Sequence, residues 1–153
     1  MGRLDVSLSQ EELDAFLGSQ RTVRLATVGP DGVPNVIPLW FVWTEGAMFV
    51  NTTRGNRSVR NLEANPMGAA TVDDGEQYEE LRGVVLRGRV EEADGDRRLD
   101  RARTAFAEKY FGGGSPHFER WKNRFFLRLE PDHVSSWDFR KIPEALAKRA
   151  ASR

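Results

Sequence analysis

The segment from Thr52 to Pro66 holds the residues best suited to bind a charged ligand. It reads TTRGNRSVRNLEANP and brings together two threonine hydroxyls, a glycine and the arginines Arg54, Arg57 and Arg60. A strand-like run precedes this segment and a short helical pattern follows, so the polar groups lie at a strand-to-helix turn. Backbone N–H groups and the helix dipole favour an anion there, and a guanidinium matches phosphate oxygens in pairs. We therefore expect a phosphate-bearing ligand, with a solvated basic turn as the alternative.

Few other side chains offer chemistry of their own. The sequence has no cysteine, which excludes disulfides and thiolate ligands. Its two histidines, His117 and His133, lie far apart in the sequence and make a poor metal set or catalytic triad. We expect no metal site, and no residue stands out as a catalytic acid or base. The glycines at 112–114 lack the preceding strand and following lysine of a phosphate loop, so they predict the exit of a helix.

Length and charge limit the class of protein. The 153 residues suit a single domain, and 23 basic against 23 acidic side chains give no field that would attract nucleic acid or an anionic membrane. The first nine residues are charged and lack the apolar core of a signal peptide. No apolar run approaches the ~20 residues that span a bilayer. We expect a cytoplasmic protein that acts on a small molecule.

The first half of the chain predicts a helix followed by a three-strand meander. Ser9 and Glu12 form a capping box, and Gly18 is a suitable stop for the helix that follows it. Pro30 and Gly32 predict a tight turn between two strands, and Pro38 predicts an edge position or a bulge, because proline cannot donate to a ladder. The expected elements are a helix over Gln10–Leu17 and strands over Arg21–Val28, Val33–Trp43 and Ala47–Thr52.

The second half predicts further strands and one long helix whose apolar residues share a face. The expected helices cover Ser58–Ala64 and Asp96–Tyr110, with a loosely held helix over Pro143–Arg153. The expected strands cover Met67–Val72, Leu81–Val90, Arg124–Leu129 and His133–Phe139. Together these elements indicate a mainly β (α+β) fold, a closed or split antiparallel β-barrel of six or seven strands. We expect residues 1–153 to form one domain, with the barrel over about 20–139 and a tail over 140–153.

The order of several motifs resembles a known family. These motifs are RTVRLATVGPDGVPNVIPLWFVW, MFVNTTRGNRSVRNLEANP, GAATVDD, VVLRGRVEE and SSWDF. They are similar to the pyridoxamine 5'-phosphate-oxidase-like split β-barrels, and most similar to the flavin/deazaflavin oxidoreductase branch, which uses the deazaflavin coenzyme F420. The resemblance runs from about Leu13 to Phe139, and its most specific parts are LATVGPDGVPNVIPLWF and RNLEANP.

The resemblance implies a homodimer with two cofactor sites at its interface. It implies a ring-binding wall formed by Ile37, Pro38, Leu39 and Trp40. The residues it implies for the phosphate and its tail are Asn51, Thr52, Thr53, Asn56, Arg57, Arg60 and Asn61, to which the sequence adds Arg54. Two positions depart from many relatives, which carry lysine in place of Ser58 and arginine in place of Met67. The phosphate anchor is therefore expected to depend on the three arginines, or the cofactor differs from the family's usual one.

The expected activity is hydride transfer between F420 and a small conjugated or electron-poor organic substrate. A deazaflavin or flavin carries its own hydride chemistry, which suits a sequence without an evident acid/base pair. The alternatives are an FMN-dependent oxidase or reductase of the same fold and a non-catalytic flavin or tetrapyrrole carrier. Tyr78 and Trp137 are candidates for the substrate side, although the loop holding Tyr78 fits a solvated hairpin equally well. The tryptophans Trp40, Trp43, Trp121 and Trp137 offer flat surfaces for a ring, or serve packing alone.

Overall fold

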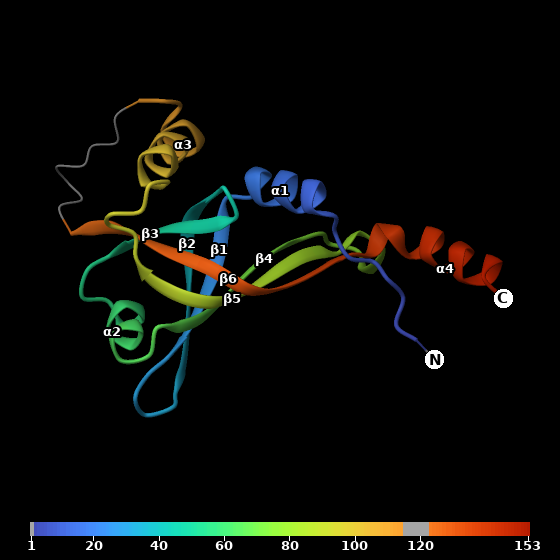
Figure 1. The fold of residues 1–153 in the computed structure, drawn as a ribbon, viewed down its shortest axis with the longest axis horizontal. Coiled ribbons are helices and arrows are strands. Elements are labelled where there is room, and N and C mark those ends of the chain that lie inside the picture. Colours follow the sequence, from blue (N-terminus) through green and yellow to red (C-terminus); the bar gives the residue numbers. More distant parts are fainter. Residues whose placement is uncertain (1, 115–122) are drawn as a thin grey trace.

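Six antiparallel strands close into a barrel in the order β1-β2-β3-β6-β5-β4 (Figure 1). The computed structural model describes residues 2–114 and 123–153, so His117 and Trp121 lie outside the described residues. The strands are β1 (Thr22–Val28), β2 (Pro34–Thr44), β3 (Ala47–Thr53), β4 (Met67–Asp74), β5 (Arg82–Glu92) and β6 (Arg124–Asp138). The predicted class, a mainly β antiparallel barrel with added helices, is confirmed.

Two helices contribute apolar side chains to the barrel core. Helix α1 (Gln10–Ser19) buries Leu13, Phe16 and Leu17, and helix α2 (Arg57–Ala64) buries Val59 and Leu62 in the same cluster. The predicted capping box begins α1, since the Ser9 hydroxyl accepts from the Glu12 N–H at 3.2 Å and Glu12 Oε2 accepts from the Ser9 N–H at 2.7 Å. Gly18 does not stop this helix, which continues to Ser19, because Gly18 does not take the left-handed conformation of a C-terminal glycine.

The β1–β2 hairpin is built as the turn residues predict. The Gly32 N–H donates to the Gly29 carbonyl at 2.9 Å, and Gly32 takes a φ of 78°, which favours glycine. Pro38 lies where β2 pairs with β1 alone, because pairing with β3 begins at Trp40. The predicted edge position is therefore confirmed, whereas the β1–β2 register passes Pro38 without a bulge.

The last strand differs from its prediction. Separate strands over Arg124–Leu129 and His133–Phe139 are wrong, because β6 runs unbroken through the segment 130–132. Pro131 pairs with Gly88 and His133 with Arg87, so one extra residue forms a bulge. Gly88 permits it, since a Cβ there would lie 2.1 Å from the Glu130 carbonyl oxygen. Proline is tolerated because β6 has parted from β3 after Leu129.

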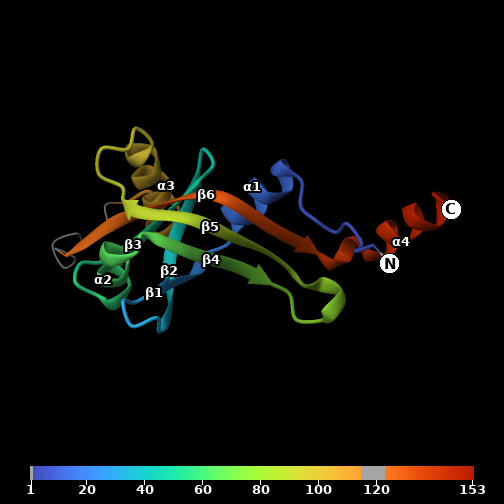
Figure 2. The ribbon, with the colours of Figure 1, turned by 60° about the horizontal axis from the view of Figure 1, so that its bottom comes forward.

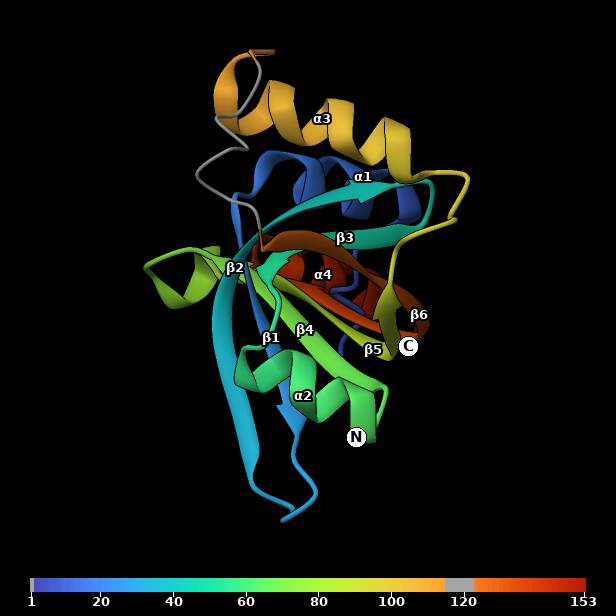
Figure 3. The same cartoon turned by 90° about the vertical axis from the view of Figure 1, so that its left-hand side faces the viewer.

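Helix α3 (Leu99–Phe111) covers the outer face of β2, β3 and β6 (Figure 3). Its residues Leu99, Ala102 and Phe106 pack with Phe49 and Phe126 in a second apolar cluster. The helix begins three residues later than predicted, because Asp96 lies in the preceding turn, where it binds the side chains of Arg98 and Arg128. Gly112 ends α3 in the left-handed conformation, as its position predicts.

The terminal segments meet at one end of the barrel. The Asp138 N–H donates to the Val6 carbonyl at 2.7 Å, and Lys141 forms an ion pair with Glu12 at 2.5 Å. Helix α4 (Ile142–Ala151) buries no side chain and projects away from the barrel (Figures 1 and 2). Within the described ranges, no helix has the length and apolarity needed to cross a bilayer.

Candidate cofactor site

A pocket of about 350 Å³ opens beside Trp40 on the outer face of β2. Trp40 pairs with Asn51 on β3, so the pleat places these two side chains on the same face of the sheet. The pocket is lined by Thr22, Pro38, Leu39, Trp40, Asn51 and Arg124. Three of the four predicted ring-wall residues therefore line it. The fourth, Ile37, is half-buried opposite Leu25 and is not among the lining residues.

The indole of Trp40 is stacked on one neighbour and still accessible to solvent. Its ring lies 4.4 Å from that of Tyr110 on α3, with the two planes only 12° apart. The Trp40 residue nevertheless keeps 38% of its surface exposed. The stack explains why a tryptophan is stable in this position, and the exposed remainder offers a flat apolar surface to a ligand.

The strand-to-helix turn after β3 is held together by its own polar side chains. Asn56 is the N-cap of α2: its Oδ1 accepts from the Val59 N–H at 2.9 Å, and its Nδ2 donates to the Thr52 hydroxyl at 2.8 Å. Asn61 is buried and donates to the Thr27 hydroxyl at 3.1 Å. Thr52, Asn56 and Asn61, all predicted as phosphate ligands, thus build the turn in this structure.

The three arginines of the turn do not converge. Arg54 forms an ion pair with Glu92, which raises the pKa of the arginine, and its guanidinium lies 4.1 Å from the Phe125 ring centre. Arg60 donates to the Gly55 carbonyl and so braces the turn. The Arg57 side chain is exposed and makes no hydrogen bond or ion pair within the described ranges, and Thr53, the last residue of β3, is also exposed. Of the three, Arg57 is therefore the guanidinium available to an anion.

Ser58, at the position where many relatives carry lysine, faces inward. It is almost fully buried, and its hydroxyl accepts from the Asn35 side chain at 3.0 Å, which ties α2 to β2. Asn56 caps only Val59, so the N–H groups of Arg57 and Ser58 at the start of α2 need partners from outside the helix. These two N–H groups and the Arg57 side chain are the donors that this turn can offer to an anion.

A second cavity of about 460 Å³ adjoins the Trp40 pocket and was missed by sequence reasoning. The two share Asn51 and Arg124, and Arg124 donates to Asn51 Oδ1 at 3.2 Å. The second cavity is lined by Asn51, Arg54, Asp94, Arg103, Phe106, Ala107, Arg124, Phe125 and Phe126. Arg124 lies here because β6 pairs with β3 with Thr53 opposite Arg124. No local sequence signal reports a pairing between strands 70 residues apart.

Comparison with known proteins identifies the family. Residues 9–138 match the family model of pyridoxamine 5'-phosphate oxidase. The chain belongs to this family. Three solved structures resemble this pyridoxamine 5'-phosphate oxidase-like chain. The conserved hypothetical protein Rv2991 of Mycobacterium tuberculosis is 29% identical, with 94% of this chain and 92% of that chain covered and a TM-score of 0.80. An FAD-binding protein of Mesorhizobium loti is 25% identical, with 85% of this chain and 94% of that chain covered and a TM-score of 0.65. An F420 reductase is 27% identical, with 80% of this chain and 94% of that chain covered and a TM-score of 0.59. No curated protein matches the sequence.

The two substrate-side candidates lie away from the Trp40 pocket of this pyridoxamine 5'-phosphate oxidase-like chain. Tyr78 is exposed, with its ring 5.0 Å from that of Phe139. Trp137 packs over Gly83, where an added Cβ would lie only 2.4 Å from the indole. Both sit at the end of β5 where the chain enters the strand, opposite the end that carries α2 (Figure 2). One chain alone therefore does not bring them to the Trp40 pocket.

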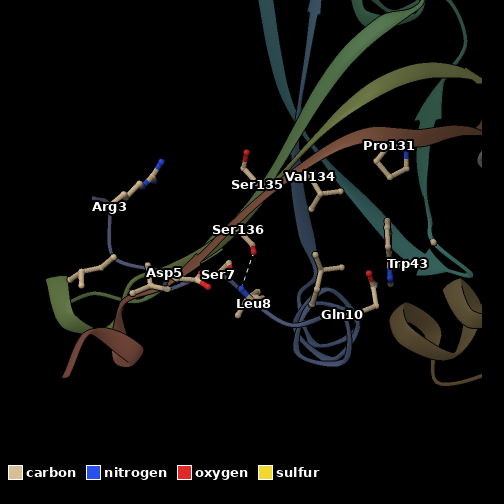
Figure 4. Close-up of a pocket in the computed structure, with 14 residues that line it drawn as sticks. Arg3, Asp5, Ser7, Leu8, Gln10, Trp43, Pro131, Val134, Ser135 and Ser136 are labelled. Carbon is tan, nitrogen blue, oxygen red and sulfur yellow. Dashed lines mark hydrogen bonds between the residues drawn. The ribbon is translucent and has the colours of Figure 1, made fainter. Parts of the chain in front are cut away.

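A larger cavity, of about 760 Å³, lies at that same far end of the barrel (Figure 4). It is lined by the N-terminal segment, Trp43 and the second half of β6, and the Leu8 N–H donates to the Ser136 hydroxyl at 2.9 Å. It contains none of the predicted cofactor-binding residues. Volume alone thus does not identify the site, whereas the Trp40 pocket is lined by Asn51 of β3, the strand that leads into the turn of Arg57.

Proposed function

We propose that this chain is an oxidoreductase that binds F420 and transfers hydride between the deazaflavin and a small conjugated or electron-poor molecule. One observation carries the proposal: β3 supplies Asn51 to the pocket beside the exposed face of Trp40, and it then leads into the turn where the Arg57 side chain has no partner within the described ranges. A flat apolar surface near an anion-binding turn suits a ligand with a planar ring at one end and a phosphate at the other. The likeness to an F420 reductase supports the choice of deazaflavin.

The residues present fit such a cofactor. Pro38, Leu39 and Trp40 would border its ring, and Arg57 with the first N–H groups of α2 would bind its phosphate. The cofactor supplies the hydride chemistry when bound, so the protein need only bind it, orient it and exclude water. The described residues that line the Trp40 pocket include apolar, aromatic and amide side chains, which suit binding and orientation of a cofactor.

A flavin is the alternative cofactor. The FAD-binding relative is 25% identical over most of the chain, and FMN would use the same ring pocket and phosphate turn. The two cofactors differ in the acidic tail of F420, which would extend beyond the phosphate toward further arginines. A carrier without catalytic activity is the remaining alternative, and it would bind a cofactor without substrate-dependent turnover.

The cofactor is tested by titrating the purified protein with F420, FMN and FAD while recording visible absorption and fluorescence. We expect F420 to bind more tightly than FMN at low salt, with the difference narrowing as salt screens the exposed ion pairs over ~8–10 Å. Strong FMN binding without any F420 signal would contradict the F420 proposal and indicate a flavin cofactor. Turnover of reduced F420 with electron-poor acceptors then separates an enzyme from a carrier.

We further propose a homodimer in which a second copy covers the Trp40 pocket. The pocket has a volume of about 350 Å³, which is small for a ligand-binding pocket, and it is open to solvent. The strands β1, β2 and β4 carry the exposed apolar residues Val28, Val36 and Met67, and Val36, which is 60% exposed, lies two residues before the pocket residue Pro38. An apolar patch of this kind is typical of an interface between proteins.

The dimer is tested by light scattering at micromolar concentration. We expect twice the mass of one 17.3 kDa chain, and we expect Val36→Glu to shift the protein toward the monomer and to weaken cofactor binding. Leu146→Glu is the matched control, because Leu146 is also exposed, at 50%, and lies on α4, which projects away from the barrel (Figure 1). A wild-type protein that remains a monomer would contradict the shared site.

A further inference from the structure

The aromatic stack beside the pocket continues into helix α3. Tyr110 lies against one face of the Trp40 indole, and the Arg21 guanidinium lies over the Tyr110 ring at 4.8 Å. Trp40 also meets Phe111 edge-on at 6.1 Å. One side of the indole is thus packed by α3, while Trp40 lines the pocket with the surface that remains exposed.

The Tyr110 hydroxyl is inserted at the end of the β1–β2 ladder. Regular pairing ends at Thr22 and Trp40, so Arg21 and Phe41 would form the next pair. The hydroxyl instead accepts from the Phe41 N–H at 3.0 Å and lies 2.6 Å from the Arg21 carbonyl and 2.8 Å from the Phe41 carbonyl. A hydroxyl has one hydrogen, so the two carbonyls share it. Tyr110 therefore binds both strands at the residue adjacent to Trp40.

The neighbouring residue strengthens this attachment. Lys109 donates to the Phe41 carbonyl at 3.2 Å, and its ammonium lies 4.3 Å from the Phe41 ring centre. Burial, aided by the nearby Arg21, lowers the pKa of Lys109 to about 8, while burial raises the pKa of Tyr110, which keeps its hydroxyl protonated. Two consecutive side chains at the end of α3 thus anchor the helix to β2 beside the pocket.

We propose that Tyr110 is a positioning residue of the cofactor site, which holds the Trp40 indole so that its exposed surface stacks on the cofactor ring. The inference rests on the proposed function. An unsupported tryptophan on a strand would lose side-chain freedom each time a ring bound to it. Tyr110 fixes the indole beforehand, so ring binding no longer carries that cost.

Phosphate-free ligands isolate this contribution from that of the phosphate turn. The probes are riboflavin beside FMN, and the ribityl-deazaflavin core of F420 beside F420 itself. We expect Tyr110→Leu to weaken both members of each pair by the same factor, about three- to tenfold, in line with the loss of one aromatic contact. Arg57→Ala should instead weaken only the phosphate-bearing member. Tyr110→Phe keeps the stacked ring but loses the hydroxyl. We therefore expect the logarithm of its dissociation constant to rise about half as much as in Tyr110→Leu.

A double-mutant cycle gives a readout that a general structural role would not reproduce. Once Trp40→Leu has removed the indole, we expect Tyr110→Leu to add little further loss of ring affinity, because the two residues act through one contact. The absorption band of the bound ring should shift in Tyr110→Leu toward its position in Trp40→Leu. Melting temperatures identify variants that fail to fold. If Tyr110→Leu fails to fold, Tyr110→Phe replaces it in the cycle.

The possible failures are distinguishable. A wild-type protein that binds none of the four probes would refute the proposed function. Binding by the wild type that is weakened by Trp40→Leu but unchanged in folded Tyr110→Leu would overturn the positioning role alone. Full additivity of the two substitutions would overturn it as well. If Tyr110→Leu fails to fold, the test passes to Tyr110→Phe. A Tyr110→Phe variant that binds the ring as tightly as the wild type, with an unshifted absorption band, would also contradict the positioning role.

Discussion

Replacing Arg57 with alanine is expected to weaken the binding of a phosphate-bearing cofactor about ten- to a hundredfold. Arg57 is exposed at the first position of α2 and has no partner within the described ranges, so an anion can take its guanidinium without breaking another contact. Arg57→Lys should restore only part of the affinity, because an ammonium cannot form the paired bonds of a guanidinium. Cofactor affinity measured for both variants checks this result.

Three further measurements make the Arg57 result specific. Arg60→Ala should lower the melting temperature as well as the affinity, because Arg60 braces the turn through the Gly55 carbonyl. Arg101→Ala, an exposed arginine on α3, should change neither quantity. Turnover at saturating cofactor should stay the same in Arg57→Ala, since the phosphate lies away from the reacting ring. Unchanged affinity in Arg57→Ala would reduce this segment to a basic surface turn.

Replacing Asp96 with asparagine is expected to destabilise the fold by about 3 kcal/mol, the lower end of the range for breaking a buried ion pair. The Asp96 side chain is only 5% exposed and bridges Arg98 at 2.9 Å and Arg128 at 2.7 Å. Its loss leaves two guanidiniums close together with fewer opposing charges, although Glu130 still pairs with Arg98 at 2.6 Å. Denaturant unfolding of the two proteins at pH 7 measures the difference.

The same carboxylate predicts how stability depends on pH. The guanidinium of Arg98 holds the pKa of Asp96 well below its ordinary value. A carboxyl whose pKa is lowered in the folded state stabilises that state above its ordinary pKa, and this contribution is lost as the pH falls toward the folded value. The difference in the free energy of unfolding between the wild type and Asp96→Asn should therefore narrow below about pH 4. Asp100→Asn, exposed on α3, should show no such gap at any pH.

Features written in neighbouring residues could be predicted from the sequence. The capping box at Ser9 and Glu12, the turn at Gly29–Gly32 and the N-terminus of α2 are each made by side chains within a few positions of one another. Strand alternation likewise identified β1, whose residues Val23, Leu25 and Thr27 are buried. Local chemistry decides such elements, so a single sequence reports them well.

Features that depend on distant contacts could not be predicted in this way. In β6 the side chains that enter the barrel core are those of Phe125, Leu127 and Leu129. Beyond the bulge the same face of the sheet instead carries Val134 and Ser136, which pair with the buried Leu86 and Val84. A strand in which the inward-facing positions change from odd-numbered to even-numbered residues has the sequence pattern of two separate strands. Arg54 is turned from the phosphate site by Glu92, and Tyr110 reaches β2 from α3, and neither contact leaves a local signal.

The closure of the barrel has a consequence for the order in which the chain folds. The β1–β2, β2–β3 and β4–β5 pairs are hairpins between neighbouring segments, whereas β3 meets β6 only when Thr53 reaches Arg124. Closing a loop of this length costs entropy that the hairpins do not carry. Asn51 and Arg124 come together in that same step, so we expect the pocket to be absent from any partly folded form. A ligand of this pocket would then recognise only chains that have completed folding, and would shift the folding equilibrium toward them.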